Sequence, residues 1–247
     1  MDRMLYVAMN GAKQALVSQA ANSHNLANVN TTGFRQDLYN FQSIEAEGAG
    51  LNTRAYVMTE GPGVSHQPGP VNTTGRDLDV AINGDGFLAV QAPDGTEAYT
   101  RAGDLRLSNG GILTTGAGHP VIGSGGPIAL EPAESIVVAT DGTISIRPLG
   151  AAPDETTPVE RLKLVNPDLS QLVKGQDGLL RLRDGGFVSA DASVTVAAGA
   201  REGSNVNAVE AMVNMIALSR NYELNVRMMR VAEENDAAEA RLLNLNL

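Results

Sequence analysis

Apolar residues recur at alternating steps of four and three near both ends of the chain, and this repeat limits the fold more than any other feature. Such spacing places the repeating positions on one face of a helix that packs against another helix. The N-terminal repeat consists of Leu5, Met9, Ala12, Leu16, Gln19, Ser23 and Leu26, and the C-terminal repeat of Ala211, Met215, Leu218, Tyr222, Asn225, Met229 and Ala232. The sequence therefore predicts a long helix over residues 2 to about 28 and a second one after Asn207.

Two further features of the predicted helices are the cap of the second and the low charge of the first. Asn207 and Glu210 have the spacing of a capping box, which marks the start of the second helix. The first helix carries charges only at Asp2, Arg3 and Lys13. Because a solvated helix normally has a charged outer face, we expect neighbours to cover the first helix on several sides. The alternative is a helix inside one ordinary globular core.

The stretch from Asn22 to Phe34 closes the first helix. Gly33 can adopt a positive φ without a Cβ clash, so we expect it to stop the helix, and Phe34 to anchor the emerging chain. Amide side chains compete for backbone hydrogen bonds and are poorly suited to helix interiors. Four of them crowd this stretch, at Asn22, Asn25, Asn28 and Asn30. They indicate a helix end that is held by partners.

The middle of the chain is rich in turns. Residues 35–76 have no clear periodicity and predict an extended connector with one strand near residues 55–59. After Leu78, short apolar runs alternate with turns such as Asp94-Gly95, Asn109-Gly110-Gly111, Asp141-Gly142 and Asp184-Gly185-Gly186. The expected strands cover residues 78–82, 87–90, 112–114, 121–122, 135–139, 144–147, 162–165, 179–182 and 194–196. This pattern predicts an antiparallel sandwich or barrel-like domain over residues 77–203.

The predicted fold class is therefore α+β. A helical domain is built from residues 1–34 and 204–247, whose long terminal helices form a coiled coil. Residues 35–76 connect it to the central, mainly antiparallel β domain.

Composition excludes several classes of function. The net charge of −10 argues against a nucleic-acid partner, because binding phosphates needs clustered Lys and Arg. The absence of Cys removes disulfides, thiolate catalysis and the common structural zinc sites. No apolar run reaches the length of a membrane span, and the N-terminus lacks the pattern of a cleavable signal peptide. Taken alone, these features would favour a cytoplasmic protein.

No group of residues has the spacing of a catalytic, cofactor or metal site. Asp77, Asp79 and Asp85 could suggest a cation site, and Asn83-Gly84-Asp85-Gly86 resembles part of a calcium loop. However, Val80, Ala81 and Ile82 occupy positions where oxygen ligands should lie. A β-turn is the expected structure there. The glycine pair at positions 84 and 86 lacks the third glycine of a dinucleotide loop. The three histidines lie far apart in sequence and have no paired spacing. From all of these patterns together, we expect no enzymatic activity, no cofactor and no small-molecule substrate.

Sequence blocks in three regions of the chain match the signatures of one protein family. Asn25-Leu26-Ala27-Asn28, followed by Thr31, Gly33 and Phe34, matches the N-terminal signature of this family, with His24 in place of its first Asn. The segments Leu78-Asp79-Val80-Ala81-Ile82-Asn83-Gly84-Asp85-Gly86-Phe87 and Tyr99-Thr100-Arg101-Ala102-Gly103-Asp104 match two blocks of its central domain. Asn205-Val206-Asn207 and Arg220-Asn221-Tyr222-Glu223 resemble its C-terminal signature. By these blocks the chain resembles the bacterial flagellar rod and hook proteins.

The resemblance implies a structural subunit of the proximal rod of the flagellar basal body, which assembles with copies of itself and with other rod proteins into a hollow shaft that transmits torque. It also implies export by the flagellar type III apparatus without cleavage, so that the subunit lies in the periplasmic rod and not in a membrane. Alternatives are a distal-rod or hook protein and, in a different class, a secreted β-domain protein that binds a ligand. The implied assembly residues are Leu5, Met9, Leu16, Asn25, Leu26, Ala27, Asn28, Gly33, Phe34, Met215, Leu218, Tyr222 and Met229.

Overall fold

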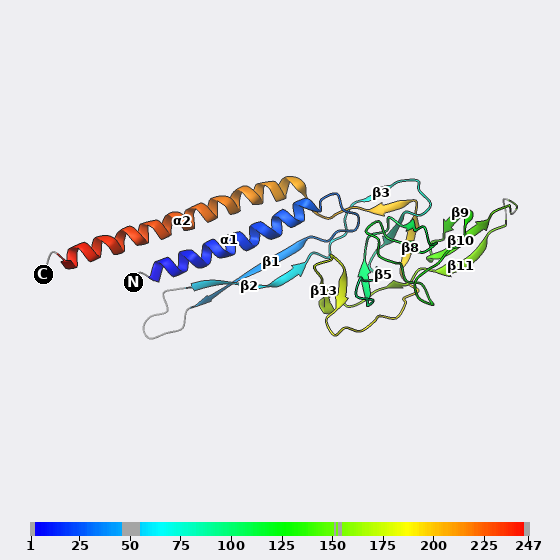
Figure 1. The fold of residues 1–247 in the computed structure, drawn as a ribbon, viewed down its shortest axis with the longest axis horizontal. Helices are drawn as coiled ribbons and strands as arrows, with labels where there is room; N and C mark the ends of the chain where they lie inside the picture. The colour runs from blue at the N-terminus through cyan, green and yellow to red at the C-terminus, as the bar shows by residue number, and fades with distance from the viewer. Residues whose placement is uncertain (1–2, 46–54, 151, 153–154, 245–247) are drawn as a thin grey trace. The chain divides into compact units, whose positions relative to one another are not determined.

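A computed structural model describes residues 3–45, 55–150, 152 and 155–244 of the chain (Figure 1). The chain forms two compact units. Unit 1 contains the described residues of 1–29, 36–65 and 206–247, and unit 2 contains those of 30–35 and 66–205. The fold class is α+β, with a long helix near each end and mainly antiparallel strands between them, as the sequence predicts.

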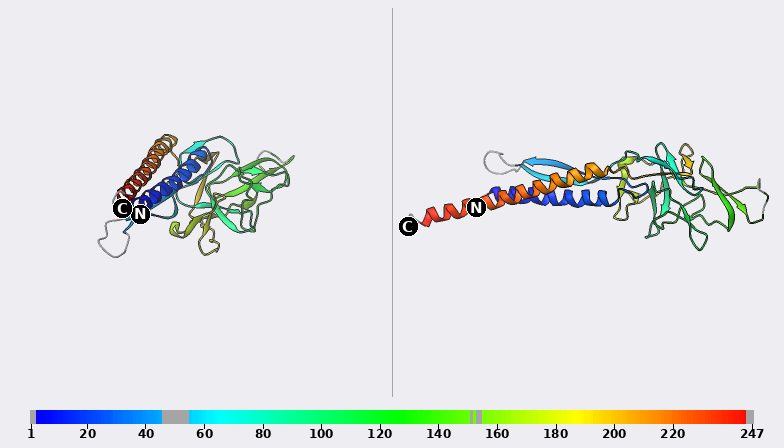
Figure 2. Two further views of the ribbon diagram at one scale, coloured as in Figure 1. Left: turned by 60° about the vertical axis from the view of Figure 1, so that its left-hand side comes forward. Right: turned by 90° about the horizontal axis from the view of Figure 1, so that it is seen from above.

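Unit 1 consists of two antiparallel helices and a β-hairpin. Helix α1 (Arg3–Ala27) and helix α2 (Ala208–Asn244) run side by side (Figures 1 and 2). Strands β1 (Asp37–Glu45) and β2 (Ala55–Val64) pair antiparallel, from Asp37 opposite Val64 to Glu45 opposite Ala55. The strand expected near residues 55–59 is present and longer than predicted. Its partner β1 was not predicted, so much of the region expected to be an irregular connector is a hairpin.

The start of α2 agrees with the predicted cap, whereas the end of α1 differs from the prediction. At the start of α2, the Asn207 Oδ1 accepts hydrogen bonds from the main-chain N–H groups of Val209 (3.0 Å) and Glu210 (3.3 Å), as the predicted cap requires. Helix α1 ends at Ala27, several residues before Gly33. Gly33 does have a positive φ, of 66°, but it lies in unit 2. The expectation that Gly33 stops the helix is therefore wrong, and its conformation serves a different contact, described below.

Inside the chain, helix α1 buries its predicted seam only in part, with Ala12 buried and Gln19 and Leu26 half-buried. Its buried positions are small residues, namely Ala8, Ala12, Ala15 and Ala21, together with Asn25. Leu5, Met9 and Leu16 of the predicted seam are exposed instead. Small side chains allow a closer approach of neighbouring elements than Leu and Met do, so the alanine face packs within the unit. On α2 the predicted positions are the more buried ones, with Ala211 and Ala232 buried and Met215, Leu218 and Met229 half-buried.

Unit 2 contains the strands of the β domain and one short 3₁₀ helix. The strands are β3 (Val71–Thr73), β4 (Val80–Asn83), β5 (Phe87–Gln91), β6 (Glu97–Thr100), β7 (Arg106–Leu107), β8 (Leu113–Thr114), β9 (Ala133–Val138), β10 (Thr143–Pro148), β11 (Thr157–Arg161), β12 (Leu164–Val165), β13 (Leu172–Lys174), β14 (Leu180–Leu182), β15 (Thr195–Ala198) and β16 (Ala200–Glu202). The short helix η1 covers Leu169–Gln171. All of the strand pairs are antiparallel.

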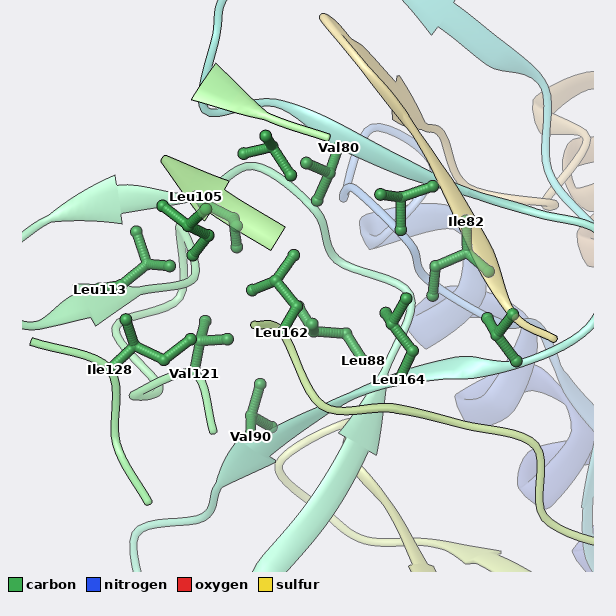
Figure 3. Packing of buried hydrophobic residues seen from close by; sticks show 14 of the residues in the cluster. Val80, Ile82, Leu88, Val90, Leu105, Leu113, Val121, Ile128, Leu162 and Leu164 are labelled. Carbon is green, nitrogen blue, oxygen red and sulfur yellow. The ribbon is translucent and has the colours of Figure 1, made fainter. Parts of the chain in front are cut away.

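The sheets of unit 2 are small and share one hydrophobic core. A five-stranded sheet has the order β12-β5-β6-β14-β13, a three-stranded sheet has the order β11-β10-β9, and the remaining strands form pairs. Figure 3 shows the core, in which Leu88 and Val90 of β5 meet apolar residues from the surrounding strands and loops. Most of the predicted strands are present, although residues 121–122 form only isolated bridges. Strand β6, which pairs with both β5 and β14, was not predicted.

No helix in the described part of the chain is both long enough and apolar enough to cross a membrane.

Candidate assembly surface and buried ion cluster

Helix α1 is covered on two sides by other elements of unit 1. On the side of the hairpin, Gln14 Nε2 donates to the Val57 carbonyl (3.3 Å), and Asn10 Oδ1 accepts from the Val57 N–H (3.3 Å). On the side of α2, Asn22 Nδ2 donates to the Ala211 carbonyl (2.6 Å). A Cβ added to Gly11 would lie 2.5 Å from Asn225 Oδ1, so glycine permits this approach. The hairpin of β1 and β2 thus covers one side of α1, which explains in part why this helix carries few charges.

Asn25 fastens the end of α1 to the start of β1. Its side chain is buried, its Nδ2 donates to the Asp37 carbonyl (2.9 Å), and its Oδ1 accepts from the Asp37 N–H (2.8 Å). His24 Nδ1 lies 2.7 Å from the Asp37 carboxylate. The amide of Asn25 therefore uses both of its hydrogen-bonding groups on the backbone of Asp37. Asn28 Nδ2 donates to the His24 carbonyl (2.9 Å), while Leu26 is half-buried and Ala27 is exposed.

The third side of α1 is an exposed apolar stripe. It consists of Leu5, Met9 and Leu16, whose spacing places them on one helix face. Helix α2 has an exposed stripe on the face opposite Ala211, Met215 and Leu218. That stripe consists of Val209, Val213, Ile216, Leu224 and Val231. Exposed apolar stripes of this length mark surfaces that other molecules cover. Tyr222, a predicted assembly residue, is 37% exposed.

The last residues of the N-terminal signature belong to unit 2. Phe34 is buried, and Lys174 Nζ lies 3.9 Å from the centre of its ring and donates to the Arg35 carbonyl (2.7 Å). The N–H of Gly33 donates to the Glu202 carbonyl (2.9 Å). A Cβ on Gly33 would overlap the main chain of Arg101 and Ala102. The sequence predicted the special backbone of Gly33 but assigned it to the wrong structural role.

Three charged residues from distant parts of the sequence form a buried ion cluster, defined here as Arg35, Arg101 and Glu202. Arg35 Nη2 lies 2.9 Å from Glu202 Oε1, and Arg101 Nη1 lies 3.0 Å from Glu202 Oε2. The exposed fraction of Glu202 is only 1%, and both arginines are also buried. Removing one partner from such a pair leaves a buried charge uncompensated and typically costs about 3–5 kcal/mol.

Further hydrogen bonds hold other groups of the cluster. Glu202 Oε1 also accepts from the Gly69 N–H (2.9 Å), and Arg101 Nη2 donates to the Gly84 carbonyl (2.7 Å). Arg35 Nη1 donates to the Gln67 carbonyl. Burial lowers the pKa of Arg35, the carboxylate of Glu202 acts in the opposite direction, and the charge of Arg101 lowers it further. Burial, followed by the charge of Arg35, also lowers the pKa of nearby His66, so its neutral form is favoured.

One cavity in unit 2 has a volume of about 580 Å³. Phe187, which is 77% exposed, lies at its edge, and Lys163 Nζ lies 5.6 Å from the centre of the Phe187 ring. Lys163 is held by the Glu97 carboxylate at 2.7 Å. Of the three aromatic residues in the β domain, Phe87 and Tyr99 are buried. A ligand site built on exposed aromatic side chains would therefore have Phe187 alone.

One of the acidic residues considered as cation ligands has other partners. Asp79 is buried, accepts from Thr74 Oγ1 (2.7 Å) and lies 3.2 Å from Arg76 Nη2. Within the described residues, no group of three or more His, Asp or Glu side chains could hold a metal ion.

Comparison with known proteins gives matches to flagellar proteins along most of the chain. Family models described as "Flagella basal body rod protein", "Flagellar hook protein FlgE/F/G D1 domain" and "Flagellar basal body rod FlgEFG protein C-terminal" match residues 5–35, 81–146 and 197–242. The flagellar basal-body rod protein FlgF of Salmonella typhimurium is 41% identical over 252 residues, and that of Escherichia coli is 42% identical, with both chains covered completely. The chain belongs to the flagellar basal-body rod protein F family.

Other rod proteins are more distant. The flagellar basal-body rod protein FlgG of Bacillus subtilis is 30% identical over 95% of this chain and 96% of its own length. The ion cluster draws one residue from each of the three regions that the rod and hook family models match. Arg35 ends the first region, Arg101 lies in the second and Glu202 in the third.

The sequence reasoning missed two features of the rod-family chain. It did not identify Arg35 or Glu202, although Arg35 directly follows the Gly33-Phe34 signature. Nor did it identify the outer stripe of α2. The signal for that stripe was present, because Val209, Val213 and Ile216 repeat at steps of four and three, as the predicted seam does.

Proposed function

We propose that the protein is a structural subunit of the bacterial flagellar basal-body rod that assembles with copies of itself and with other rod proteins into a hollow shaft. One structural observation supports this most directly: the two helices of unit 1 already pack together, yet each still exposes an apolar stripe. Membership of the rod protein F family agrees with the proposal. A contact between different surfaces that does not close into a ring generates an open helical assembly.

In this assembly, the exposed stripes of α1 and α2 are covered by helices of neighbouring subunits, which together line the central channel as coiled coils. The assembly residues Leu5, Met9 and Leu16 lie on the α1 stripe, whereas Met215, Leu218, Tyr222 and Met229 position α2 against α1. Transmission of torque needs many contacts that act together, and it needs no catalytic residue, cofactor or small-molecule substrate.

The identities favour a position in the proximal rod over the alternatives. The FlgF proteins of Salmonella typhimurium and Escherichia coli are 41% and 42% identical to this chain, against 30% for the FlgG protein of Bacillus subtilis. We propose that the subunit lies in the proximal rod, in the periplasmic space, after export through the flagellar type III apparatus without cleavage, as the resemblance to rod proteins implies. A distal-rod or hook protein is the alternative within the family.

A substitution in the α2 stripe tests the proposal. Ile216 is 58% exposed, so Ile216→Lys should leave the unfolding temperature of the purified subunit nearly unchanged. In cells that lack the native subunit, Ile216→Lys should fail to restore swimming, because a charge would enter the dry contact between helices. Ile216→Leu is the matched control and should restore it. Normal swimming of the Ile216→Lys cells would contradict the assigned assembly surface.

Exposed Phe187 beside the large cavity supports a second candidate function, a secreted β domain that binds a carbohydrate or peptide. Under that alternative, an oligosaccharide or peptide should shift the NMR signals of Phe187 and Lys163, and Ile216→Lys should have no effect on function.

A further inference from the structure

The chain passes between unit 1 and unit 2 four times. These passages lie after Val29, Arg35, Ser65 and Asn205. In unit 2, the residues at the passages therefore belong to three short segments, 30–35, 66–69 and 202–205. We call these the passage segments.

Each passage segment is bonded to both of the others. Segment 202–205 bonds to segment 30–35 through Glu202, whose carbonyl accepts from Gly33 and whose carboxylate pairs with Arg35. It bonds to segment 66–69 through the Gly69 N–H on Glu202 Oε1 and through Asn205 Nδ2, which donates to the Gln67 carbonyl (2.9 Å). Arg35 joins segment 30–35 to segment 66–69, because its Nη1 donates to the same Gln67 carbonyl.

Arg101 connects this set to the β core. It reaches Glu202 with Nη1 and the Gly84 carbonyl with Nη2, and its guanidinium carbon lies 5.3 Å from the centre of the buried Phe87 ring. The single carboxylate of Glu202 thus faces two buried arginines. In a buried network of this kind, the loss of one member leaves the others unsatisfied, so its members are ordered or disordered together.

We propose that Glu202, with Arg35 and Arg101, forms a clasp that makes the three passage segments one cooperative element of unit 2. Load that arrives along the chain from the helices then enters unit 2 through all three segments at once. Without the clasp, each segment would open independently. The load would then enter the β domain only through the segments that remained closed.

Hydrogen exchange followed by mass spectrometry on the full-length subunit tests the clasp. Glu202→Gln keeps the shape of the side chain but removes the charge that both arginines need. We expect exchange at least about tenfold faster in all three passage segments, while the core strand β5 keeps its protection. Asp79→Asn is the matched control, because it removes another buried carboxylate of unit 2 that pairs with Thr74 and Arg76 instead. It should leave the passage segments protected.

If Glu202→Gln does not fold, the variant Arg35→Met tests the clasp instead. Arg35→Met keeps the pair of Arg101 and Glu202 and removes the bonds of Arg35 itself. The clasp predicts faster exchange in segments 66–69 and 202–205 as well as in segment 30–35. Faster exchange confined to segment 30–35, or unchanged exchange in all three segments, would overturn the proposal. Since this readout uses the isolated subunit, it is independent of whether the protein assembles into a rod.

Discussion

At the scale of single residues, aspartates shape the turns of unit 2 through one repeated local bond. In each, the carboxylate accepts from the main-chain N–H and the hydroxyl of a Ser or Thr two positions later. The pairs are Asp94 with Thr96, Asp141 with Thr143, Asp168 with Ser170 and Asp191 with Ser193. These bonds favour the charged carboxylate and hold the pKa of all four aspartates below its usual range.

The lowered pKa values predict how these turns respond to acid. A carboxyl whose pKa is lower in the folded than in the unfolded chain contributes stability fully above its unfolded pKa of about 3.9. That contribution is lost as the pH falls through the folded value. The hydroxyl of Thr143 is the largest cause of the lowered pKa of Asp141, whereas the N–H of Ser170 is the largest cause for Asp168.

We therefore expect Thr143→Ala to raise the pKa of Asp141, and Ser170→Ala to raise that of Asp168, toward the usual value. NMR titration of the two carboxyl carbons below pH 6 measures both values. An unchanged pKa at either carboxyl would contradict this assignment of causes.

Glycine at position 33 is required both by its backbone conformation and by its neighbours. Gly75 has a similar φ of 70°, but an added Cβ there meets no other described atom within 4 Å. We expect Gly75→Ala to cost about 1 kcal/mol of unfolding free energy from backbone strain alone. Gly33→Ala should cost a further ~1–3 kcal/mol, because its Cβ would displace the main chain of Arg101. Denaturant unfolding of both variants gives the comparison, and equal costs would rule out the close packing.

At the scale of elements, the sequence predicted which helices form better than which faces they use. Periodicity places Leu16 and Ala15 on different faces of α1, but it cannot tell whether the face with large side chains is covered by the same chain or by another. In this chain the small residues pack internally and Leu16 is exposed. On α2 the seam through Leu218 was predicted as a packing face and is half-buried, while the outer stripe was overlooked.

The strands show the same limit in another form. Turns such as Asp94-Gly95 and Asp141-Gly142 have local chemistry that can be read directly, and Gly95 and Gly142 do have positive φ values. Strand β1 has no comparable local signal. It depends on pairing with β2 and on contacts with α1, as between Asn25 and Asp37. The ion cluster was out of reach for the same reason, because its residues are brought together only by the tertiary fold.

The two leucines of unit 1 give a matched test of the faces. Leu16→Ala and Leu218→Ala remove the same atoms from helical positions, but Leu16 is 53% exposed and Leu218 is half-buried. We expect Leu16→Ala to change the unfolding free energy of the helical unit by less than about 0.5 kcal/mol. Leu218→Ala should cost about 1–2 kcal/mol. Circular dichroism during thermal unfolding of the isolated subunit measures both, and a cost at Leu16 as large as at Leu218 would mean that the α1 stripe belongs to the subunit's own core.

At the scale of the whole molecule, the two units depend on different sources of stability. Unit 2 has a continuous core that includes Leu88, Val90 and Leu113, all fully buried. Unit 1 has narrow contacts between small residues, and many of its large apolar side chains are exposed. A helix gains most of its stability from tertiary packing, so in the proposed assembly the helices would reach their full stability only when other subunits cover the stripes.

The ends of α2 should therefore differ in the free subunit. This helix has 37 residues against 25 in α1, which makes it about 18 Å longer at a rise of about 1.5 Å per residue. Ala232 is the last buried residue described on α2, and in Figure 1 the helix continues past the start of α1. We expect amides of α2 after Ala232 to exchange fastest, those of α1 and the rest of α2 at intermediate rates, and those of β5 slowest. In assembled rods the helical amides should become as protected as those of β5, because neighbouring subunits then supply the missing contacts. Hydrogen exchange on the free and the assembled protein distinguishes the two states, and helices that are fully protected in the free subunit would show that their stability does not depend on assembly.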